Sequence, residues 1–251
     1  MNHRVAIVRE PGKSFPRCVT SHPLQHTINV ANAKKQHAIY CNTLKELGLE
    51  VIYLPIDDTH PDSCFVEDNA VIHNKKALIT RMGVATRRGE EVIVEKALND
   101  FLETKRTLAP GTIEGGDVIH LPDRLICGVT QRTNHDGVNQ MIKWLDVSVE
   151  IWVDPNIVHL KSNFTYLGKD TVIAAKAYTN HPLLNKMNIL VVESDESYAA
   201  NTLTINNSVL MPKGFPNSRT MVTEAGFEVI PLEMSEFQKC EGALTCLSLI
   251  F

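Results

Sequence analysis

Short apolar and alternating runs recur along the whole chain, and segments with helical periodicity lie between them. We interpret the short runs as β-strands because they are bounded by turn-forming residues. They cover 4–9, 49–54, 69–73, 77–82, 106–109, 117–121, 124–129, 147–153, 157–160, 164–167, 171–176, 188–193, 202–205, 208–211, 227–232 and 244–250. Apolar residues at i, i+3, i+4 and i+7 predict helices at 30–47, 89–103, 134–145, 181–187 and 216–225.

Turn signals between the strand-like runs predict hairpins. Asn74-Lys75-Lys76, Pro122-Asp123 and Gly168-Lys169-Asp170 each separate two runs, and a helical segment or its approach follows each hairpin. The recurring unit is therefore β-β-α-β, and five helical segments predict five such units. No linker rich in proline, glycine or serine divides residues 1–251, so we expect one domain with a radial arrangement. An open mixed α/β sheet is the alternative that this pattern leaves open.

Composition and charge exclude several classes of function. The chain has 251 residues, 43% of them hydrophobic, which is enough for a sizeable core. A formal net charge of −4 without a lysine or arginine block argues against nucleic-acid binding. The sequence contains neither a signal peptide nor an apolar run of about 18 residues, so we expect a cytoplasmic protein without a membrane partner.

The cysteines suggest neither a zinc site nor a disulfide framework. They carry no CxxC pair or finger-like spacing, and reduced thiols are the expectation; the six are Cys18, Cys41, Cys64, Cys127, Cys240 and Cys246. Cys246 lies in the last strand-like run, five residues from the end of the chain. Because a free cysteine is usually a small, buried hydrophobe, any function for Cys246 has to be argued from other residues.

Three carboxylates fall within seven residues directly before an apolar run: Asp62, Glu67 and Asp68. If residues 65–68 are extended, Glu67 and Asp68 point to opposite faces and cannot serve one pocket equally. Asp62 and Asp68 share parity if the extension reaches back that far. A solvated acidic turn is the alternative interpretation.

Glu114 and Asp117 flank a glycine pair at the entrance to a strand-like run, and glycine permits close approach of a ligand or another backbone. The acids and the absence of GxGxxG spacing disfavour a phosphate loop. His159 ends another run and is a candidate general acid/base, although a lone histidine is more often structural. Arg87 and Arg132 are candidates for binding a carboxylate, or else ordinary surface residues.

Taken together, a thiol, a histidine and several carboxylates at strand ends suit nucleophilic substitution at a cationic, planar carbon. With these residues, the sequence resembles the dimethylarginine dimethylaminohydrolases of the guanidine-modifying pentein superfamily. The segments that carry the resemblance run in family order across nearly the whole chain: 61–68, 78–81 with Arg87-Arg88, 114–118, 132–134, 159–162 and 244–246.

The resemblance implies a five-bladed α/β propeller of ββαβ modules with a central active site. It implies that Cys246 is the nucleophile, that His159 is the general acid/base and that Glu114 orients or assists it. Asp62 and Asp68 would hold a guanidinium group. No metal or other cofactor is implied, although zinc held by the cysteine and histidine is a hypothetical inhibitor.

The resemblance also implies the other contacts of a small guanidino amino acid. Glu67 would support the residues that touch the substrate without touching it itself. Arg87 and Arg132 would clamp the substrate carboxylate. The loop around Phe15 and the backbone near Cys240 would receive its α-amino group. The implied substrate-binding residues are Asp62, Glu67, Asp68, Arg87, Arg132, Phe15, Cys240 and Ser162.

The amino-terminal loop departs from the family pattern. Phe15-Pro16 stands where familiar members have a leucine followed by a small or flexible residue, and this loop is a lid in the family. A methyl group in an apolar pocket changes binding by only about 1–3 kcal/mol. The sequence therefore leaves open an arginine deiminase or amidinotransferase. A non-catalytic pentein-fold binding protein is a further alternative, and the protein can be a monomer or a homodimer.

Overall fold

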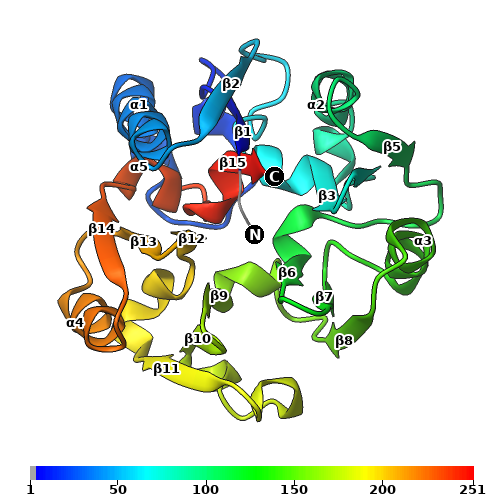
Figure 1. Ribbon diagram of the computed structural model, residues 1–251. Coiled ribbons are helices and arrows are strands. Elements are labelled where there is room, and N and C mark those ends of the chain that lie inside the picture. Colours follow the sequence, from blue (N-terminus) through cyan, green and yellow to red (C-terminus); the bar gives the residue numbers. More distant parts are fainter. Residues whose placement is uncertain (1–3) are drawn as a thin grey trace.

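Five three-stranded sheets surround a common centre, with the helices at the periphery (Figure 1). The computed structural model describes residues 4–251. From the inner to the outer strand, the sheets are β15 (Ser248–Ile250), β1 (Val5–Arg9) and β2 (Glu50–Leu54); β3 (Ala70–His73), β4 (Lys76–Ile79) and β5 (Glu103–Arg106); β6 (Val118–His120), β7 (Leu125–Val129) and β8 (Val149–Val153); β9 (Phe164–Gly168), β10 (Thr171–Ala175) and β11 (Asn188–Val192); and β12 (Leu203–Ile205), β13 (Ser208–Pro212) and β14 (Glu228–Leu232).

Every sheet has the same pairing pattern. The middle strand pairs antiparallel with the inner strand and parallel with the outer strand. A parallel pair needs a crossover connection, and helices supply it in four modules: α1 (Val30–Glu46), α2 (Glu91–Leu98), α3 (His135–Leu145) and α4 (Pro216–Glu224). In the remaining module, the short 3₁₀ turns η7 (Lys176–Tyr178) and η8 (Pro182–Leu184) connect β10 to β11.

The two ends of the chain build one sheet together. β15 pairs antiparallel with β1, for example Ile7 opposite Leu249, while β1 pairs parallel with β2. This pairing brings the last residues beside the first ones and completes the ring of modules. The prediction of a five-bladed α/β propeller of ββαβ modules is confirmed, and the alternative of an open mixed sheet is wrong.

Several predicted elements differ in detail. Residues 157–160 form no strand, the strand expected at 106–109 lies at β5, and the helix expected at 181–187 is only the η8 turn. That segment is too short for a stable helix without strong tertiary support. The short helix α5 (Ser235–Gln238) was not predicted.

A 3₁₀ turn precedes each inner strand. These turns are η3 (Val66–Asn69), η5 (Gly115–Asp117), η6 (Leu160–Ser162), η9 (Ser194–Ala200) and η10 (Thr245–Leu247). The segment 244–250, predicted as one strand, is therefore split, and Cys246 lies in η10 rather than in β15. Because all inner strands face the centre (Figure 1), their entry turns bring distant parts of the sequence together.

The expectation of six reduced thiols is wrong for two of them. Cys18 and Cys240 form a disulfide across 222 residues of sequence, with their Cα atoms 6.1 Å apart. Only the fold brings these residues together, so their spacing in the sequence carried no signal. The bond joins the amino-terminal loop, which contains η1 (Phe15–Arg17) and η2 (Gln25–Thr27), to the turn after α5.

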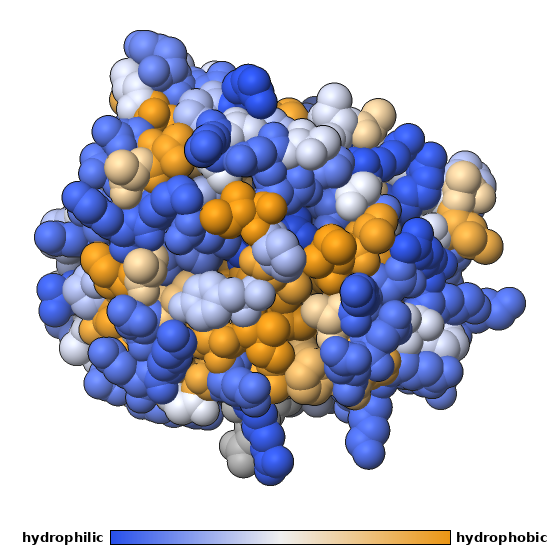
Figure 2. Space-filling model, turned by 90° about the horizontal axis from the view of Figure 1, so that it is seen from above, coloured by the Kyte–Doolittle hydropathy of each residue, from blue (hydrophilic) through white to orange (hydrophobic). Residues whose placement is uncertain are grey.

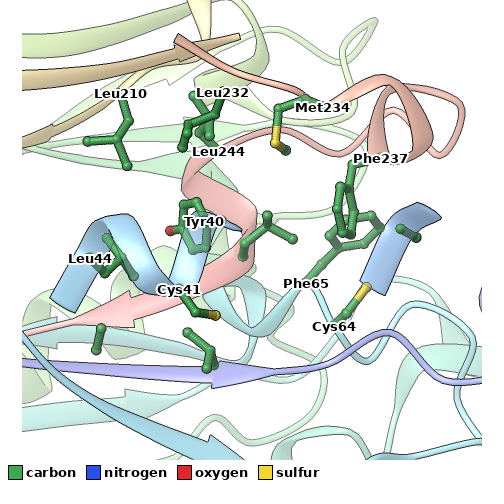
Figure 3. Packing of buried hydrophobic residues seen from close by; sticks show 14 of the residues in the cluster. Tyr40, Cys41, Leu44, Cys64, Phe65, Leu210, Leu232, Met234, Phe237 and Leu244 are labelled. Carbon is green, nitrogen blue, oxygen red and sulfur yellow. The ribbon is translucent and has the colours of Figure 1, made fainter. Parts of the chain in front are cut away.

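An aromatic cluster packs beneath the amino-terminal loop. The ring centroid of Phe15 lies 5.9 Å from that of Phe65 and 5.4 Å from that of Phe237. Figure 3 shows Phe65 and Phe237 side by side, with Cys64 close to Phe65. All three rings are buried, so this cluster fixes the loop from below.

The face shown in Figure 2 is largely hydrophilic, with a contiguous apolar area near its middle and smaller apolar spots around it. The exposed large hydrophobic residues include Tyr53, Ile56, Val92 and Phe101. No helix within residues 4–251 is long and apolar enough to cross a membrane.

Candidate active site

Four entry turns bring most of the predicted site residues to the centre of the ring. Asp68 lies in η3, Glu114 directly precedes η5, His159 directly precedes η6 and Cys246 lies in η10. η3 contacts both η5 and η10, and η5 contacts η6. The turns thereby bring residues that are far apart in the sequence into one site. Glu67 and Thr245, for example, share a hydrogen bond across 178 positions.

The centre of the site is a short hydrogen bond between a histidine and a carboxylate. Nε2 of His159 lies 2.7 Å from Oε2 of Glu114 and 3.7 Å from Oδ1 of Asp68. The other oxygen of Glu114 accepts a hydrogen bond from the backbone N–H of Gly83. Both carboxylates are buried, so their charges act on the imidazole with little screening by water.

The glycine pair makes this close approach possible, as the sequence predicted. A Cβ atom at Gly116 would lie 2.8 Å from the His159 ring and 3.0 Å from Oδ1 of Asp68. A Cβ atom at Gly115 would lie 2.0 Å from the backbone oxygen of Glu67. In place of a side chain, the N–H of Gly116 donates a 3.0 Å hydrogen bond to Asp68.

Arg87 is buried among carboxylates in this structure. Its guanidinium donates to Oδ2 of Asp68 at 2.8 Å and to both oxygens of Glu90, and it lies 3.8 Å from Glu114. Although burial opposes the charge, Glu90, Asp68 and Glu114 together hold the pKa of Arg87 well above its ordinary value. The sequence predicted Arg87 as a clamp for the substrate carboxylate, but here it pairs with the acids of the protein itself.

The sequence placed Glu67 and Asp68 on opposite faces only if the backbone is extended, and the backbone is instead a 3₁₀ turn. The two side chains nevertheless have different partners. Glu67 accepts hydrogen bonds from Nζ of Lys161 at 2.6 Å and from Oγ1 of Thr245 at 2.8 Å. Thr245 immediately precedes Cys246. Glu67 therefore joins the histidine turn to the cysteine turn, and burial raises its pKa although Lys161 opposes the rise.

Asp62 and Arg132 lie at the edge of this charge network. Asp62 is buried and accepts the backbone N–H of Val19 at 3.1 Å on each oxygen. Burial raises its pKa, opposed by the charges of Arg87 and Arg132. Nη1 of Arg132 is buried without a hydrogen-bond partner within residues 4–251, and such a donor can bind an anion.

The remaining predicted contacts lie in different surroundings. Phe15 is fully buried, so only its backbone and neighbours can face a ligand. Cys240 is held in the disulfide, and the adjacent Glu241 accepts hydrogen bonds from the hydroxyl of Thr20 and the N–H of Ser21. Ser162 is exposed at the end of η6, where its N–H bonds to the His159 carbonyl oxygen.

Cys246 differs from the other free thiols of the described chain. Cys41, Cys64 and Cys127 are buried, whereas Cys246 is partly exposed. Burial of its sulfur and the charges of Glu67 and Asp68 raise the pKa of Cys246 to about 12. The thiol is therefore protonated at neutral pH unless a cation enters the site.

The histidine carries the opposite charge to its surroundings. Burial alone would lower the pKa of His159, but Asp68, Glu114 and Asp117 raise it to about 9. Burial would raise the pKa of Asp68, yet His159 and Arg87 hold it at about 2. His159 is thus an imidazolium at neutral pH and can donate a proton.

These shifts predict how stability depends on pH. Because the folded pKa of His159 is raised, its contribution is complete below pH 6.5 and is lost as the pH rises towards about 9. The shift corresponds to about 3 kcal/mol. We expect the free energy of unfolding to fall by up to this amount across that range, and to fall less in His159→Asn. Urea unfolding at several pH values measures the difference, and parallel pH profiles for the two proteins would refute the assignment.

Donor atoms of Asp68, Glu114 and His159 lie within 4.8 Å of one another, a spacing that could admit a metal ion. The Arg87 guanidinium already neutralises this cluster, with Asp68 at 2.8 Å and Glu114 at 3.8 Å. The geometry is therefore that of an ion-pair network, and a cation would have to displace Arg87.

Sequence reasoning missed several residues that support the site. Lys161 and Glu90 each pair with a predicted residue, and Asn201 donates hydrogen bonds to Thr245 and to the Lys161 backbone. Asn201 could have been predicted as a site residue from its position directly before the strand-like run 202–205, because the other modules also place polar residues before their inner strands. Partners on different modules carry no signal in a single sequence.

The ring of ββαβ modules, with its polar residues at the inner turns, defines the pentein class of α/β propellers. A family model described as "N,N dimethylarginine dimethylhydrolase, eukaryotic" matches residues 17–246. The chain is 36% identical over 250 residues to the N(G),N(G)-dimethylarginine dimethylaminohydrolase of Pseudomonas aeruginosa, covering 98% of each protein. It is 32% identical over 252 residues to the Streptomyces coelicolor protein of that name, covering 99% of this chain and 97% of the relative.

A solved structure agrees with these similarities. The P. aeruginosa protein, as a cysteine-to-serine mutant complexed with citrulline, matches with a TM-score of 0.97, 34% identity and complete coverage of both chains. The chain therefore belongs to the dimethylarginine dimethylaminohydrolase family.

Proposed function

We propose that this protein is a cysteine-dependent hydrolase of N-methylated arginines that releases citrulline and methylamine or dimethylamine. The observation that carries the proposal is the buried pair between Asp68 and the Arg87 guanidinium, 2.8 Å apart and beside His159. A site that already binds one guanidinium ion has the charge and geometry to bind another. We further propose that the chain acts as one catalytic domain.

Family membership supports the same activity. The similarity to relatives named for dimethylarginine hydrolysis extends over nearly the whole chain. In the matching structure, that protein is complexed with citrulline, the product expected here.

Binding would begin with exchange of one guanidinium for another. The substrate cation would pair with Asp68 and Asp62, and Arg87 would turn from the acids towards the substrate carboxylate. Arg132 would bind the same carboxylate, which is consistent with its buried and unpartnered nitrogen. Guanidinium groups suit this task because they bind carboxylates in bidentate geometry. The loop around Phe15 and Cys240 would receive the α-amino group.

The cation would also activate the nucleophile. Although the substrate guanidinium only replaces that of Arg87 at Asp68, its carbon would also lie against the sulfur. Its charge there opposes the field that raises the pKa of Cys246, so the thiol can release its proton to solvent and form a thiolate at neutral pH. The sulfur attacks the guanidinium carbon and forms a tetrahedral adduct. The His159 imidazolium then protonates the amine, the carbon–nitrogen bond breaks, and an S-alkylthiouronium remains on Cys246.

Hydrolysis would complete the cycle through the neutral imidazole left by the first step. His159 removes a proton from water, hydroxide adds to the thiouronium carbon, and the carbon–sulfur bond breaks to give citrulline. As the carbon–sulfur bond breaks, the hydroxyl proton of the adduct passes to the departing thiolate, so Cys246 is again a thiol and His159, which took a proton from water, is again an imidazolium. Glu114 would hold the imidazole in place through its 2.7 Å bond and stabilise the imidazolium. A cytoplasmic location and a monomeric or homodimeric state remain predictions.

A product screen tests the proposed function. Purified protein is assayed with arginine, monomethylarginine, asymmetric dimethylarginine and agmatine. The ureido product (citrulline, or N-carbamoylputrescine from agmatine), the released amines and ammonia are measured. We expect the highest kcat/KM with a methylated arginine, accompanied by one equivalent of methylamine or dimethylamine. Ammonia from unmodified arginine would indicate a deiminase, and guanidine transfer to an added amine would indicate an amidinotransferase. No turnover of any of these compounds would contradict the proposal.

A further inference from the structure

Asp117 is a fully buried carboxylate that none of the proposed chemical steps uses. Its Oδ1 accepts the backbone N–H of Leu160 at 2.9 Å. Its Oδ2 accepts the hydroxyl groups of Thr133 at 2.6 Å and Thr130 at 2.8 Å. Three donors from two other segments therefore converge on one side chain.

These donors lead directly to the histidine and its partner. Leu160 is the residue after His159, so its N–H fixes the backbone from which the imidazole projects. Oγ1 of Thr133 also accepts the backbone N–H of Glu114 at 3.1 Å. Asp117 thus anchors both members of the 2.7 Å bond between His159 and Glu114, the first through the backbone of Leu160 and the second through Thr133.

Asp117 is also connected to Arg132, which was predicted to bind the substrate carboxylate. Oγ1 of Thr130 accepts the backbone N–H of Arg132 at 3.1 Å, so the loop that carries Arg132 is tied to Asp117 as well. The neighbouring strand leaves the necessary room, because a Cβ atom at Gly128 would lie 3.0 Å from Oδ1 of Asp117. The position is therefore built around a charged side chain.

Burying this carboxylate has a cost that the fold alone does not explain. Burial raises the pKa of Asp117 to about 6, although His159 and Thr133 oppose the rise. A carboxylate held in this way stabilises the structure only when all its hydrogen bonds are made. Those hydrogen bonds hold the backbone next to His159 and at Glu114, and a displacement of about 1 Å in catalytic geometry can lower a rate by about 100-fold.

We propose that Asp117 is a positioning residue that sets the geometry of the His159–Glu114 pair, acting through Leu160 and Thr133. The proposal rests on the proposed function for its kinetic consequence. Its geometric consequence, the integrity of the His159–Glu114 bond, does not depend on the identity of the substrate.

The test compares Asp117→Asn with Thr133→Val and Thr133→Ser. Asparagine keeps the size of the side chain but cannot accept all three donors, and serine restores the hydroxyl that valine removes. The control is Glu196→Gln, since Glu196 is also buried and accepts three hydrogen bonds, from Asn217 and Ser218, outside the proposed site. We expect Asp117→Asn to lower kcat by about 10- to 100-fold with a smaller change in KM.

Thr133→Val should lower kcat by about 10-fold, and Thr133→Ser should recover most of it. Glu196→Gln should keep kcat at temperatures where it is folded. Unchanged kcat in folded Asp117→Asn, or equal losses in it and in Glu196→Gln, would overturn the proposal. If Asp117→Asn does not fold, the two Thr133 variants decide: equal kcat values for valine and serine would overturn it.

A second measurement separates this inference from the proposed function. The ring-nitrogen proton of His159 that bonds to Glu114 is followed by NMR in the substrate-free protein. We expect its signal to shift or exchange faster in Asp117→Asn and Thr133→Val, but not in Thr133→Ser. If the wild-type protein turns over no substrate, the proposed function fails and this signal still decides the role of Asp117. An unchanged signal in both altered proteins would overturn it.

Discussion

Replacing Cys246 with serine is expected to lower kcat by at least about 10⁴-fold while the protein stays folded. A serine hydroxyl ionises far less readily than a thiol, and the field of Glu67 and Asp68 that already opposes a thiolate would oppose an alkoxide as well. His159 is an imidazolium in the free site and cannot remove the proton in its place. Citrulline formation from a methylated arginine measures the loss.

Cys127→Ala provides the matched control for the loss of a thiol. Cys127 is free, but it is buried in β7 within a hydrophobic cluster. We expect this variant to lose some stability and to keep kcat within about threefold at temperatures where it is folded. If Cys246→Ser kept a tenth of the wild-type kcat, Cys246 would not be the nucleophile.

Removing the imidazole should have the second largest effect. We expect His159→Ala to lower kcat by about 10³- to 10⁴-fold, because both protonation of the leaving amine and deprotonation of water depend on this ring. The defect in the first step should depend on the leaving group. S-methyl-L-thiocitrulline releases a thiol that needs less help from an acid than an amine does, so the variant should release about one equivalent of thiol and then stop.

The burst and the steady state are measured by following thiol release and citrulline formation together. His181→Asn is the control, since His181 lies before η8 and stacks on Trp152, away from the proposed site. It should behave like the wild-type protein. Equal steady-state rates for His159→Ala and the wild-type protein with a methylated arginine would show that His159 is not the acid/base.

The sequence predicted the parts of this molecule that local patterns encode. Strand-like runs and turn signals indicated the repeating module, and the glycine pair at 115–116 indicated a close approach, which His159 and Asp68 make. Glu67 and Asp68 do have different partners, but the extended backbone from which the sequence derived this is a 3₁₀ turn. The order of the motifs then indicated the family, which the similarity to known relatives confirms.

What the sequence did not predict depends on contacts between modules. Cys18 and Cys240 form a disulfide because the amino-terminal loop lies over the turn after α5, and no spacing rule relates residues 222 positions apart. The orientation of Arg87 is a second example, because a buried ion pair with Asp68 and a surface clamp have the same sequence signature. The raised pKa of Cys246 likewise depends on burial and on two acids from another turn.

The covalent intermediate gives the most direct test of the account. Wild-type protein and His159→Ala are mixed with asymmetric dimethylarginine, quenched in acid within milliseconds to seconds, and analysed by intact mass and peptide mapping. We predict an adduct on Cys246 with the mass of the substrate minus dimethylamine. Citrulline formation with no adduct on Cys246 in either protein, or with the adduct on another residue, would contradict the account.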